Sequence, residues 1–542
     1  MFLPRFQIEV DSVSVTLNMA GVSAEETAEA ASNENNSQSS VQKCISLLKA
    51  ARNDNERFAA LLLVTQLVHS NSLDKTARRS LFDAVGFNFL NRLLKSSSVP
   101  SGCSQDIYRS LALTILACFA TDEELLVHPE MTSKIPVFLG GISDEEENVN
   151  ISNDCYQILA SLGSTATGCI HLSRKEAFST LCRIASSSNQ ANAKKAIEIM
   201  VRIINNSPCD VWESQQDGLV AVLKSLSKRF KEAQDSTKFE LCNSLVLLLA
   251  SADKSVFQSY KENQWLEDIY IGVTQILQSR VSSEQRDPAI TLVSLVIELI
   301  GMDWMLGSPG QESPGLFILS TTVASIETRM ILDGKAWTEI VPRSELLISC
   351  YNILEKAINF AIVNSATFSS SDGGRQMLGS SLPKVYSLAT EAIHSIIQFL
   401  ENMAHVWDRL AVDERPVQLV YASVRVLCAW MAEETAALQD SICQLLPFLL
   451  MLGNESLDTQ AGKVFAFNIF LDENPIQGAF RLTLILGNDL LIKKRWIFRM
   501  WQAWGREKIC VLDGNQTYYP SYTTDDALDH MAWFLVTRLA YC

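Results

Sequence analysis

Apolar residues recur at helical spacing along most of the chain, from Val41 to about Leu452. The clearest stretch runs from Glu56 to Leu94, where two amphipathic segments flank a short polar link at 71–74. Positions separated by three or four residues share one face of a helix. In the first segment this face consists of Phe58, Leu61, Leu62, Thr65 and Val68. The pattern predicts an all-α fold in which neighbouring helices pack through apolar stripes.

Similar helical faces follow at 111–119, 197–204 and 241–248. Capping-box spacing, in which Ser, Thr or Asn precedes Glu by three residues, predicts helix starts between and before such faces. The pairs with this spacing are Asn53 with Glu56, Thr121 with Glu124, Ser173 with Glu176, and Thr237 with Glu240.

Two runs that begin with glycine resemble each other, Gly86–Leu94 and Gly218–Leu226. Glycine at the start of an apolar helix permits a turn or a close approach of two backbones. The recurrence favours repeat units of about 40 residues, as in armadillo or HEAT arrays. We therefore predict an armadillo/HEAT-like helical solenoid, an architecture that usually binds other molecules along an extended surface.

The chain divides into three parts by composition. Residues 1–40 are predicted to form a variable, largely disordered N-terminal segment, because a polar stretch at 33–40 cannot build a core. The helical array is expected over 41–452, and a divergent C-terminal segment over 453–542, where the helical pattern weakens. Acidic, Gly/Pro-rich or Ser/Gly-rich stretches predict loops within the array. These loops are expected near 140–153, 301–315 and 365–381.

The composition narrows the classes of function. With a net charge of −16 over 542 residues, the chain is a poor candidate for nucleic-acid binding, which depends on Lys and Arg at phosphates. Its 13 cysteines are scattered without a CxxC pair, a pattern typical of a reducing compartment. The sequence at 1–20 lacks the apolar core of a signal peptide, and no unbroken apolar run approaches bilayer length. We expect a soluble, cytoplasmic protein.

Chemical motifs do not favour an enzyme. The phosphate loop GxxxxGK[ST] and the motifs GxGxxG, HExxH and GxSxG are missing from the sequence. Glu391, His394 and His405 share one helical face, but a metal site needs further ligands from other helices. Cys169 and His171 would diverge on a helix, so they do not form a nucleophile–base pair. We predict no catalytic residues, no cofactor and no metal.

One segment has a distinct chemistry. Between Leu490 and Lys508, basic residues alternate with aromatic ones, and Ile492, Trp496, Met500 and Trp504 fall on one helical face. Such a helix can enter a calmodulin-like groove, lie on anionic lipid, or seal the end of the helical array. The residues that would contact a partner are Lys493, Lys494, Arg495, Trp496, Arg499, Trp501 and Trp504.

Several stretches, in order, resemble the neurochondrin family. They are ERFAALLLVTQLV at 56–68, RRSLFDAVGFNFLNRLL at 78–94, ACFATDEELLVHPEMTSKIP at 117–136, TKFELC at 237–242 and MAEETAALQDSICQLLPFL at 431–449. The resemblance covers roughly 41–452, while both ends depart from it. It implies an armadillo-like, non-enzymatic protein of the cytosol and of neuronal projections such as dendrites.

The resemblance also implies a scaffold or adaptor that binds signalling proteins and receptor tails. Its expected roles are in neurite outgrowth, synaptic plasticity and restraint of phosphorylation by calcium/calmodulin-dependent kinase II. A second hypothesis is a membrane-trafficking factor recruited by the basic aromatic helix, with peripheral membrane contact. Palmitoylated cysteines near the N-terminus occur in vertebrate relatives, whereas the first cysteine here is Cys44.

Overall fold

The computed structural model is built from helices. It describes residues 41–52, 54–69, 75–95, 105–142, 148–207, 211–252, 257, 264–306, 315–363, 373–410, 415–433, 438, 441–442, 444–445, 447–449 and 451–452. Every regular element within these ranges is an α-helix or a short 3-10 helix, and none of the residues described there lies in a strand. The all-α helical solenoid predicted from apolar spacing is thereby confirmed.

The chain forms two compact units that meet within α17 (Gln264–Gln278), one ending at Gly272 and the other beginning at Val273. We call them the N-terminal and C-terminal units. Within the described residues, the N-terminal unit begins with a helix over 41–50, and 14 further helices precede α17. Those before α17 are α2 (Asp54–His69), α3 (Lys75–Val85), α4 (Phe87–Lys95), α5 (Gln105–Phe119), α6 (Glu123–Leu126), α7 (Pro129–Thr132), α8 (Ile135–Gly141), α9 (Val149–Gly163), α10 (Ala166–Arg174), α11 (Ala177–Ala185), α12 (Gln190–Asn206), α13 (Val211–Ser214), α14 (Gln216–Glu232) and α15 (Thr237–Ala250).

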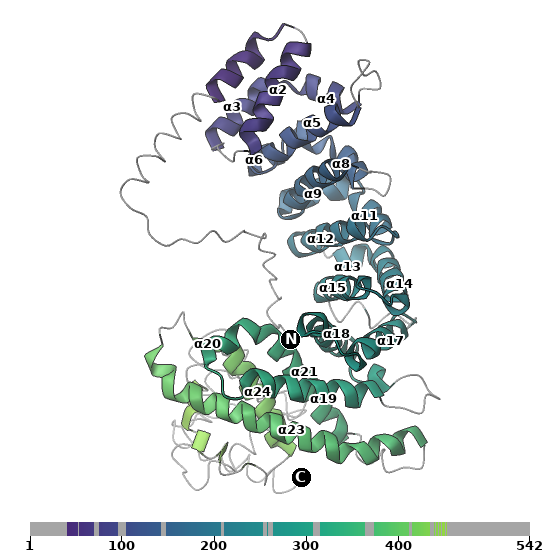
Figure 1. Ribbon diagram of the computed structural model, residues 1–542, viewed down its shortest axis with the longest axis vertical. Coiled ribbons are helices and arrows are strands. Elements are labelled where there is room, and N and C mark those ends of the chain that lie inside the picture. The colour runs from purple at the N-terminus through teal and green to yellow at the C-terminus, as the bar shows by residue number, and fades with distance from the viewer. Residues whose placement is uncertain are drawn as a thin grey trace, which may run out of the picture. The chain divides into compact units, whose positions relative to one another are not determined.

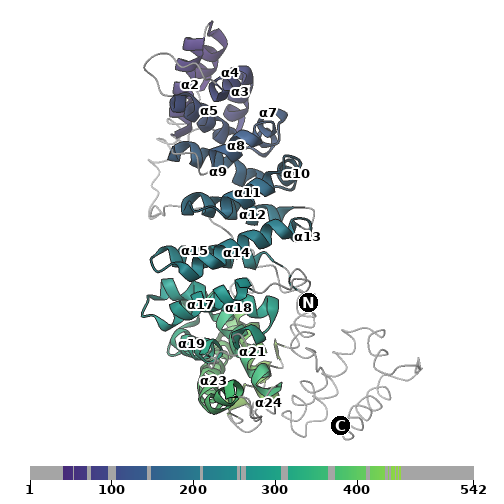
Figure 2. The ribbon, with the colours of Figure 1, turned by 90° about the vertical axis from the view of Figure 1, so that its right-hand side faces the viewer.

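Helices of the N-terminal unit stack in two layers. In one layer α5, α9, α12 and α15 contact each other in that order, and Figures 1 and 2 both show α9, α12 and α15 in succession. In the other layer α8, α11 and α14 contact each other, and each also contacts the helix that follows it in the first layer. The shared core consists of fully buried apolar side chains such as Ile158, Met200 and Leu245. Removing this surface from water stabilises the stack.

Polar contacts repeat along the stack at a nearly constant separation. The Thr114 hydroxyl donates to Asp154 at 2.7 Å, 40 residues further on. Lys195 donates to the side chain of Asn153 at 2.9 Å across 42 residues, and Arg229 donates to the carbonyl of Ser187 at 2.7 Å across another 42. These spacings match the units of about 40 residues expected from the sequence.

Gly86 and Gly218, which begin the two similar runs, have different structural roles. Gly86 has a φ of +75° and forms the turn between α3 and α4, a conformation that costs other residues free energy. Gly218 lies inside α14, where a Cβ atom would be 3.2 Å from the Cys182 sulfur of α11. The first glycine therefore makes a turn, and the second permits close packing.

The C-terminal unit uses longer helices. After α17 its elements are α18 (Ser283–Ile300), η1 (Asp303–Leu306), α19 (Gly315–Leu332), α20 (Trp337–Ile340), η2 (Val341–Arg343), α21 (Ser344–Val363), α23 (Gly373–Val406), η3 (Trp407–Arg409) and α24 (Val417–Glu433). α21 contacts both α18 and α24, while α19 and α23 pack on each other and on α21 and α24 respectively. Asn352 donates to the Ser294 hydroxyl at 2.9 Å across 58 residues. The repeating unit is therefore longer here than in the N-terminal unit.

α19 is a long and apolar helix. Among the residues that the structure describes, it alone has the length and apolar composition to cross a membrane, with a mean hydropathy of 1.3. However, 56% of this window is buried against the rest of the protein, and α19 packs on α21 and α23. Its Glu327 is 2% exposed and forms an ion pair with Arg286 of α18. These contacts identify α19 as a core helix of the C-terminal unit.

Three expected helix starts lie at other residues, and the fourth, Asn53, lies outside the described residues. α15 begins at Thr237 with Ser236 at its N-cap position, so Thr237 and Glu240 form no capping box. Asp122, and not Thr121, caps α6, because its carboxylate accepts from the backbone N–H groups of Glu124 and Leu125. The pair Ser173 and Glu176 is no capping box either, since α10 continues to Arg174 and Glu176 has a φ of +51°. At Asp122 the contact with Arg79 favours this residue as the cap, and spacing along the chain contains no information on that contact.

The helices also shorten the expected loops. α9 begins at Val149, inside the loop predicted at 140–153, with the Asn148 side chain accepting from the N–H groups of Asn150 and Ile151. The 3-10 helix η1 lies within 301–315, and α23 begins at Gly373, within 365–381. Helices therefore occupy part of each stretch that the sequence assigned to a loop.

Candidate binding surface

Two helix faces in the C-terminal unit are partly exposed, one on α19 and one on α23. On α19 the face consists of Ile326, Arg329, Met330 and Asp333, which follow the i, i+3, i+4, i+7 spacing. Asp333 directly follows the last residue of the helix. Ile326 is 42% exposed and Met330 is 59% exposed, which is unusual for a helix whose other apolar residues are largely buried. The α19 face therefore offers both apolar and charged contacts to solvent.

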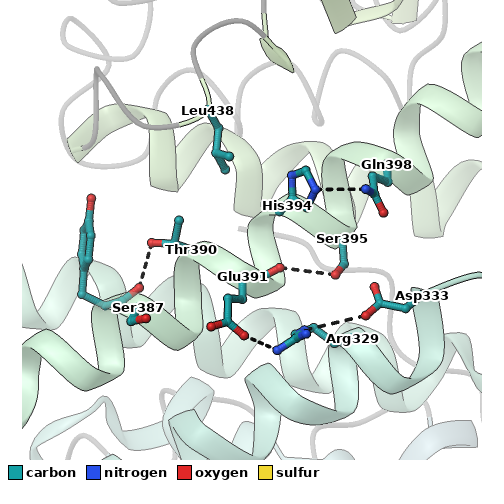
Figure 3. Close-up of a pocket in the computed structure, with 10 residues that line it drawn as sticks. Arg329, Asp333, Ser387, Thr390, Glu391, His394, Ser395, Gln398 and Leu438 are labelled. Carbon is teal, nitrogen blue, oxygen red and sulfur yellow. Dashed lines mark hydrogen bonds and ion pairs between the residues drawn. The ribbon is translucent and has the colours of Figure 1, made fainter.

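The exposed face of α23 is mostly polar. It lines a cavity of about 610 Å³ together with Arg329 and Asp333 at the end of α19 and with Leu438 (Figure 3). Tyr386, at 46% exposed, adds an aromatic side chain whose ring centroid lies 5.1 Å from that of Trp430 on α24. The cavity is lined by Arg329, Asp333, Tyr386, Ser387, Thr390, Glu391, His394, Ser395, Gln398 and Leu438.

Arg329 is the central charge of this cavity. Its guanidinium forms an ion pair with Glu391 across the cavity and a second one with Asp333 at 3.7 Å (Figure 3). All three side chains are more than a third exposed, so solvent screens these pairs and each contributes less than about 1 kcal/mol to folding. With two carboxylates for one guanidinium, the trio carries an excess negative charge. The pairs are weak enough to rearrange when a ligand approaches.

A second cavity continues along α23. It has a volume of about 490 Å³ and contains Lys335 and His405 at its polar edge and Trp337 and Phe399 at its apolar side. The turn at 333–336 separates the two cavities, and Gly334 adopts a φ of +70° there. The remaining lining residues are Leu332, Gly334, Ala336, Ile340, Asn402 and Val406. We refer to the residues of both cavities as the α23 groove. Ile326 and Met330 line neither cavity, but they neighbour Arg329 on α19, and we count them as the apolar border of the groove.

The histidines that the sequence placed on one face of a helix do lie on α23. His394 shares a hydrogen bond of 3.0 Å with Gln398, while Glu391 is paired with Arg329. His405 lines the second cavity, apart from the other two. No cluster of three or more His, Cys, Asp or Glu able to hold a metal occurs in the described part of the chain. These residues therefore belong to a surface and do not converge as ligands.

Buried thiols have little nucleophilic character. Cys169 lies in the core, where burial raises its pKa to about 11, and its sulfur is 3.4 Å from the Gly163 carbonyl oxygen. Burial likewise raises the pKa values of Cys182 and Cys242 to about 12. Since the thiolate is the reactive form, these cysteines act as small apolar core residues.

The basic aromatic segment lies outside the described residues. This applies to Lys493, Lys494, Arg495, Trp496, Arg499, Trp501 and Trp504, which remain predictions from sequence. The described residues instead present the α23 groove, of which the sequence had indicated only Glu391, His394 and His405. Ile326 and Met330 were missed because α19 is rich in apolar residues on every side, and spacing alone cannot tell its exposed face from its buried ones.

Comparison with known proteins identifies the family. A family model described as Neurochondrin matches residues 35–465. The neurochondrin of Gallus gallus is 33% identical over 413 residues, which cover 76% of this chain and 56% of that protein. The neurochondrin homolog of Drosophila melanogaster is 29% identical over 422 residues, which cover 77% and 57% of the two chains. The chain thus spans just over half the length of these curated relatives.

Among solved structures, an engineered protein aligns with 86% of this chain and 98% of its own, at 14% identity and a TM-score of 0.40. The family model and the relatives together cover the helical array from its first helices to its last ones. The resemblance seen in the five sequence stretches is thereby confirmed. The chain belongs to the neurochondrin family.

Proposed function

We propose that this chain is a non-enzymatic scaffold or adaptor that binds segments of other proteins in the α23 groove. The observation that carries the proposal is the exposure of Met330 and Ile326 beside the charged trio of Arg329, Asp333 and Glu391. Ile326 and Met330 are one helical turn apart and therefore adjoin, and a contiguous exposed apolar patch bordered by polar residues marks an interaction site. A stack of helices offers such faces without any catalytic chemistry.

The chemistry of the α23 groove defines the preferred partner segment. The excess carboxylate at Arg329 favours a partner with Lys or Arg, because an added cation can pair with the carboxylate oxygens that Arg329 leaves open. Met330, Ile326 and Tyr386 favour apolar or aromatic residues on the same segment. A short amphipathic helix that carries both kinds of residue fits a groove between two helices.

Family membership supports the wider cellular role. We propose that the chain acts in the cytosol and in neuronal projections, where it binds receptor cytoplasmic tails and a signalling kinase. Binding to a basic segment of a substrate would restrain phosphorylation by calcium/calmodulin-dependent kinase II through masking of the site. Roles in neurite outgrowth and synaptic plasticity would follow from these contacts.

Crosslinking and mass spectrometry in neuronal lysate test the proposal. The full chain is compared with Met330→Asp, which places a charge on the exposed face of α19 next to Arg329. The control is Ile170→Asp on α10, an exposed isoleucine of the N-terminal unit. Partner peptides should crosslink to α19 and α23, and Met330→Asp should weaken their binding about 30-fold, the effect of a hot spot worth about 2 kcal/mol. Equal losses in both variants, or chaperones as the sole partners, would contradict the proposal.

The membrane-trafficking hypothesis rests on the sequence at 490–508, where Lys and Arg alternate with Trp and Phe. A segment of this composition binds anionic lipid when it forms an amphipathic helix. Cosedimentation of the full chain with vesicles that contain phosphatidylserine tests this role. If the chain stays in the supernatant at low salt with 490–508 intact, membrane recruitment by this segment is excluded.

A further inference from the structure

We infer that residues 488–508 of the same chain occupy the α23 groove and compete there with external partners. The inference rests on the proposed function of the α23 groove and adds its regulation. It gives the basic aromatic sequence a docking site within the protein. Three kinds of evidence support it: charge, the spacing of apolar residues, and chain connectivity.

The charges of the two surfaces are complementary. The segment 488–508 contains six basic residues and two acidic ones, in a chain whose net charge is −16. In the α23 groove, Asp333 and Glu391 share the single guanidinium of Arg329, which leaves carboxylate oxygens available to a further cation. Hydrogen bonds between charged partners are stronger than neutral ones. Lys493 and Lys494 supply adjacent amines for this contact.

The spacing of apolar and charged residues also matches. On α19, Ile326 and Met330 are exposed and one helical turn apart, and Arg329 and Asp333, which line the first cavity, follow the same spacing beside them. In the segment, a stripe that includes Trp496 and Met500 runs beside a second pair one turn apart, Arg495 and Arg499. A helix with this pattern sets its apolar stripe against α19 and its cations toward the carboxylates.

Chain connectivity allows the contact and favours it. The described chain ends at Leu452, and Leu438 already lines the first cavity of the α23 groove. The 35 residues from 453 to 487 can span up to about 120 Å when fully extended, whereas 20 residues of α23 extend about 30 Å. A tethered segment has an effective concentration in about the millimolar range. When the segment occupies the α23 groove, an external partner cannot bind there. The apparent affinity of the partner is therefore lower than its affinity for an empty groove.

A zero-length carbodiimide reagent provides the test, since it joins an amine to a carboxylate that it touches. In the full chain at micromolar concentration we expect crosslinks from Lys493 or Lys494 to Glu391 or Asp333, found by mass spectrometry. Glu391→Lys should reduce their yield at least about fivefold, and adding Lys494→Glu should restore contact as a swapped pair. Glu345→Lys is the matched control, because Glu345 is an exposed carboxylate on α21 outside the α23 groove.

The location of the crosslinks decides the outcome. A mixture of isotopically labelled and unlabelled chains distinguishes links within one chain from links between two copies. Links between copies, links spread evenly to Glu345 and other exposed carboxylates, or no links from Lys493 and Lys494 would each overturn the inference. Circular dichroism and the melting temperature establish that each variant is folded. A yield that does not recover in the swapped pair also counts against it.

The binding of external partners is measured separately from the crosslinks within the chain. If external partners still depend on Met330 while Lys493 and Lys494 do not crosslink to the α23 groove, the binding proposal stands and self-occupancy fails. If the intrachain links form but no partner depends on Met330, self-occupancy stands and the adaptor proposal fails. If both hold, Lys493→Glu with Lys494→Glu should strengthen partner binding about fivefold or more by emptying the groove.

Discussion

The ammonium group of Lys238 caps α14 by donating a hydrogen bond to the carbonyl oxygen of Phe230 at 2.9 Å. A second hydrogen bond, also of 2.9 Å, reaches the carbonyl of Ala233, the residue that ends the helix. Lys238 is only 6% exposed, and its charge lies 5.3 Å from the centroid of the Phe230 ring. The last carbonyls of a helix carry partial negative charge and have no partner within the helix. Lys238 supplies that partner from α15.

Replacing Lys238 by Met should therefore destabilise the protein. The apolar stem is retained, but the buried carbonyl of Phe230 and the partly buried carbonyl of Ala233 lose their donor, which we expect to lower the free energy of unfolding by about 1–3 kcal/mol. Urea denaturation followed by circular dichroism measures the change. Lys228→Met, at an exposed position of α14, is the control and should stay within about 0.5 kcal/mol of the parent. Equal stabilities of the two variants would disprove the capping role.

The ring of Phe230 also limits its other neighbour, Gly272. A Cβ atom at position 272 would be 2.4 Å from Phe230 Cε1, and the Phe230 side chain is fully buried. Gly272→Ala should lower the unfolding free energy by about 1–3 kcal/mol through overpacking, despite the better helix propensity of alanine. In Gly140→Ala, on α8, the added methyl group meets no atom within 4 Å. That variant should be neutral or more stable, and a thermal melt of both proteins distinguishes the cases.

The contacts of Lys238 show which structural features can be predicted from the sequence and which cannot. The stretch TKFELC was recognisable as a family sequence, and its apolar Leu241 fits a helical face, so the fold class followed from spacing. The reason for Lys238 itself could not be inferred, because it depends on the end of another helix. The same holds at Asp122, where a carboxylate one position beyond the predicted Thr121 is selected by a tertiary contact with Arg79.

The α23 groove was only partly predictable for a related reason. The shared face of His394 and His405 follows from the helical period, and the structure places both along α23. The opposing carboxylate–guanidinium contact of Glu391 and Arg329 spans 62 residues and depends on how α19 packs on α23. Spacing within one helix contains no information on such a pairing. Sequence thus predicts helix faces, whereas packing decides which faces form a cavity.

Asp122 leads to a prediction about pH. Its burial alone would raise its pKa, but hydrogen bonds from Arg79 and from the backbone of Glu124 and Leu125 outweigh this effect and lower the pKa below its usual value. The unfolded chain therefore binds the proton more readily than the folded one. The stabilisation is complete above about pH 4, the ordinary Asp range, and is lost as the pH falls through the lower pKa of the folded state.

The variant Asp122→Asn isolates this contribution. At pH 6 it should lower the unfolding free energy by about 1–3 kcal/mol, because the Arg79 contact and the cap of α6 both weaken. The difference between variant and parent should shrink as the pH is lowered from 5 to 3 in urea titrations. A difference that stays constant over this range would show that the charge of Asp122 does not stabilise the fold.

The buried cysteines should resist thiol reagents in the folded protein. Burial raises the pKa values of Cys182 and Cys242 to about 12, so at pH 8 roughly one molecule in ten thousand carries the thiolate at either site. Pulse alkylation followed by peptide mapping should show labelling at least about 100-fold slower than for the same cysteines in urea. Fast labelling of Cys182 or Cys242 in the native chain would contradict the packing described for α11 and α15.

Arg329 provides a direct test of the electrostatics of the α23 groove. Arg329→Ala removes the guanidinium that Asp333 and Glu391 share, and because all three side chains are partly exposed, folding should change by less than about 1 kcal/mol. The two carboxylates then attract a basic segment more strongly. We expect a two- to tenfold higher yield of the carbodiimide crosslinks from Lys493 and Lys494, and a steeper loss of that yield as salt is added, since salt screens exposed charges. Arg183→Ala, at an exposed arginine of α11, is the control and should leave the yield unchanged. A lower yield in Arg329→Ala than in the parent would show that Arg329 helps to hold the segment, and that carboxylates do not govern what the groove binds.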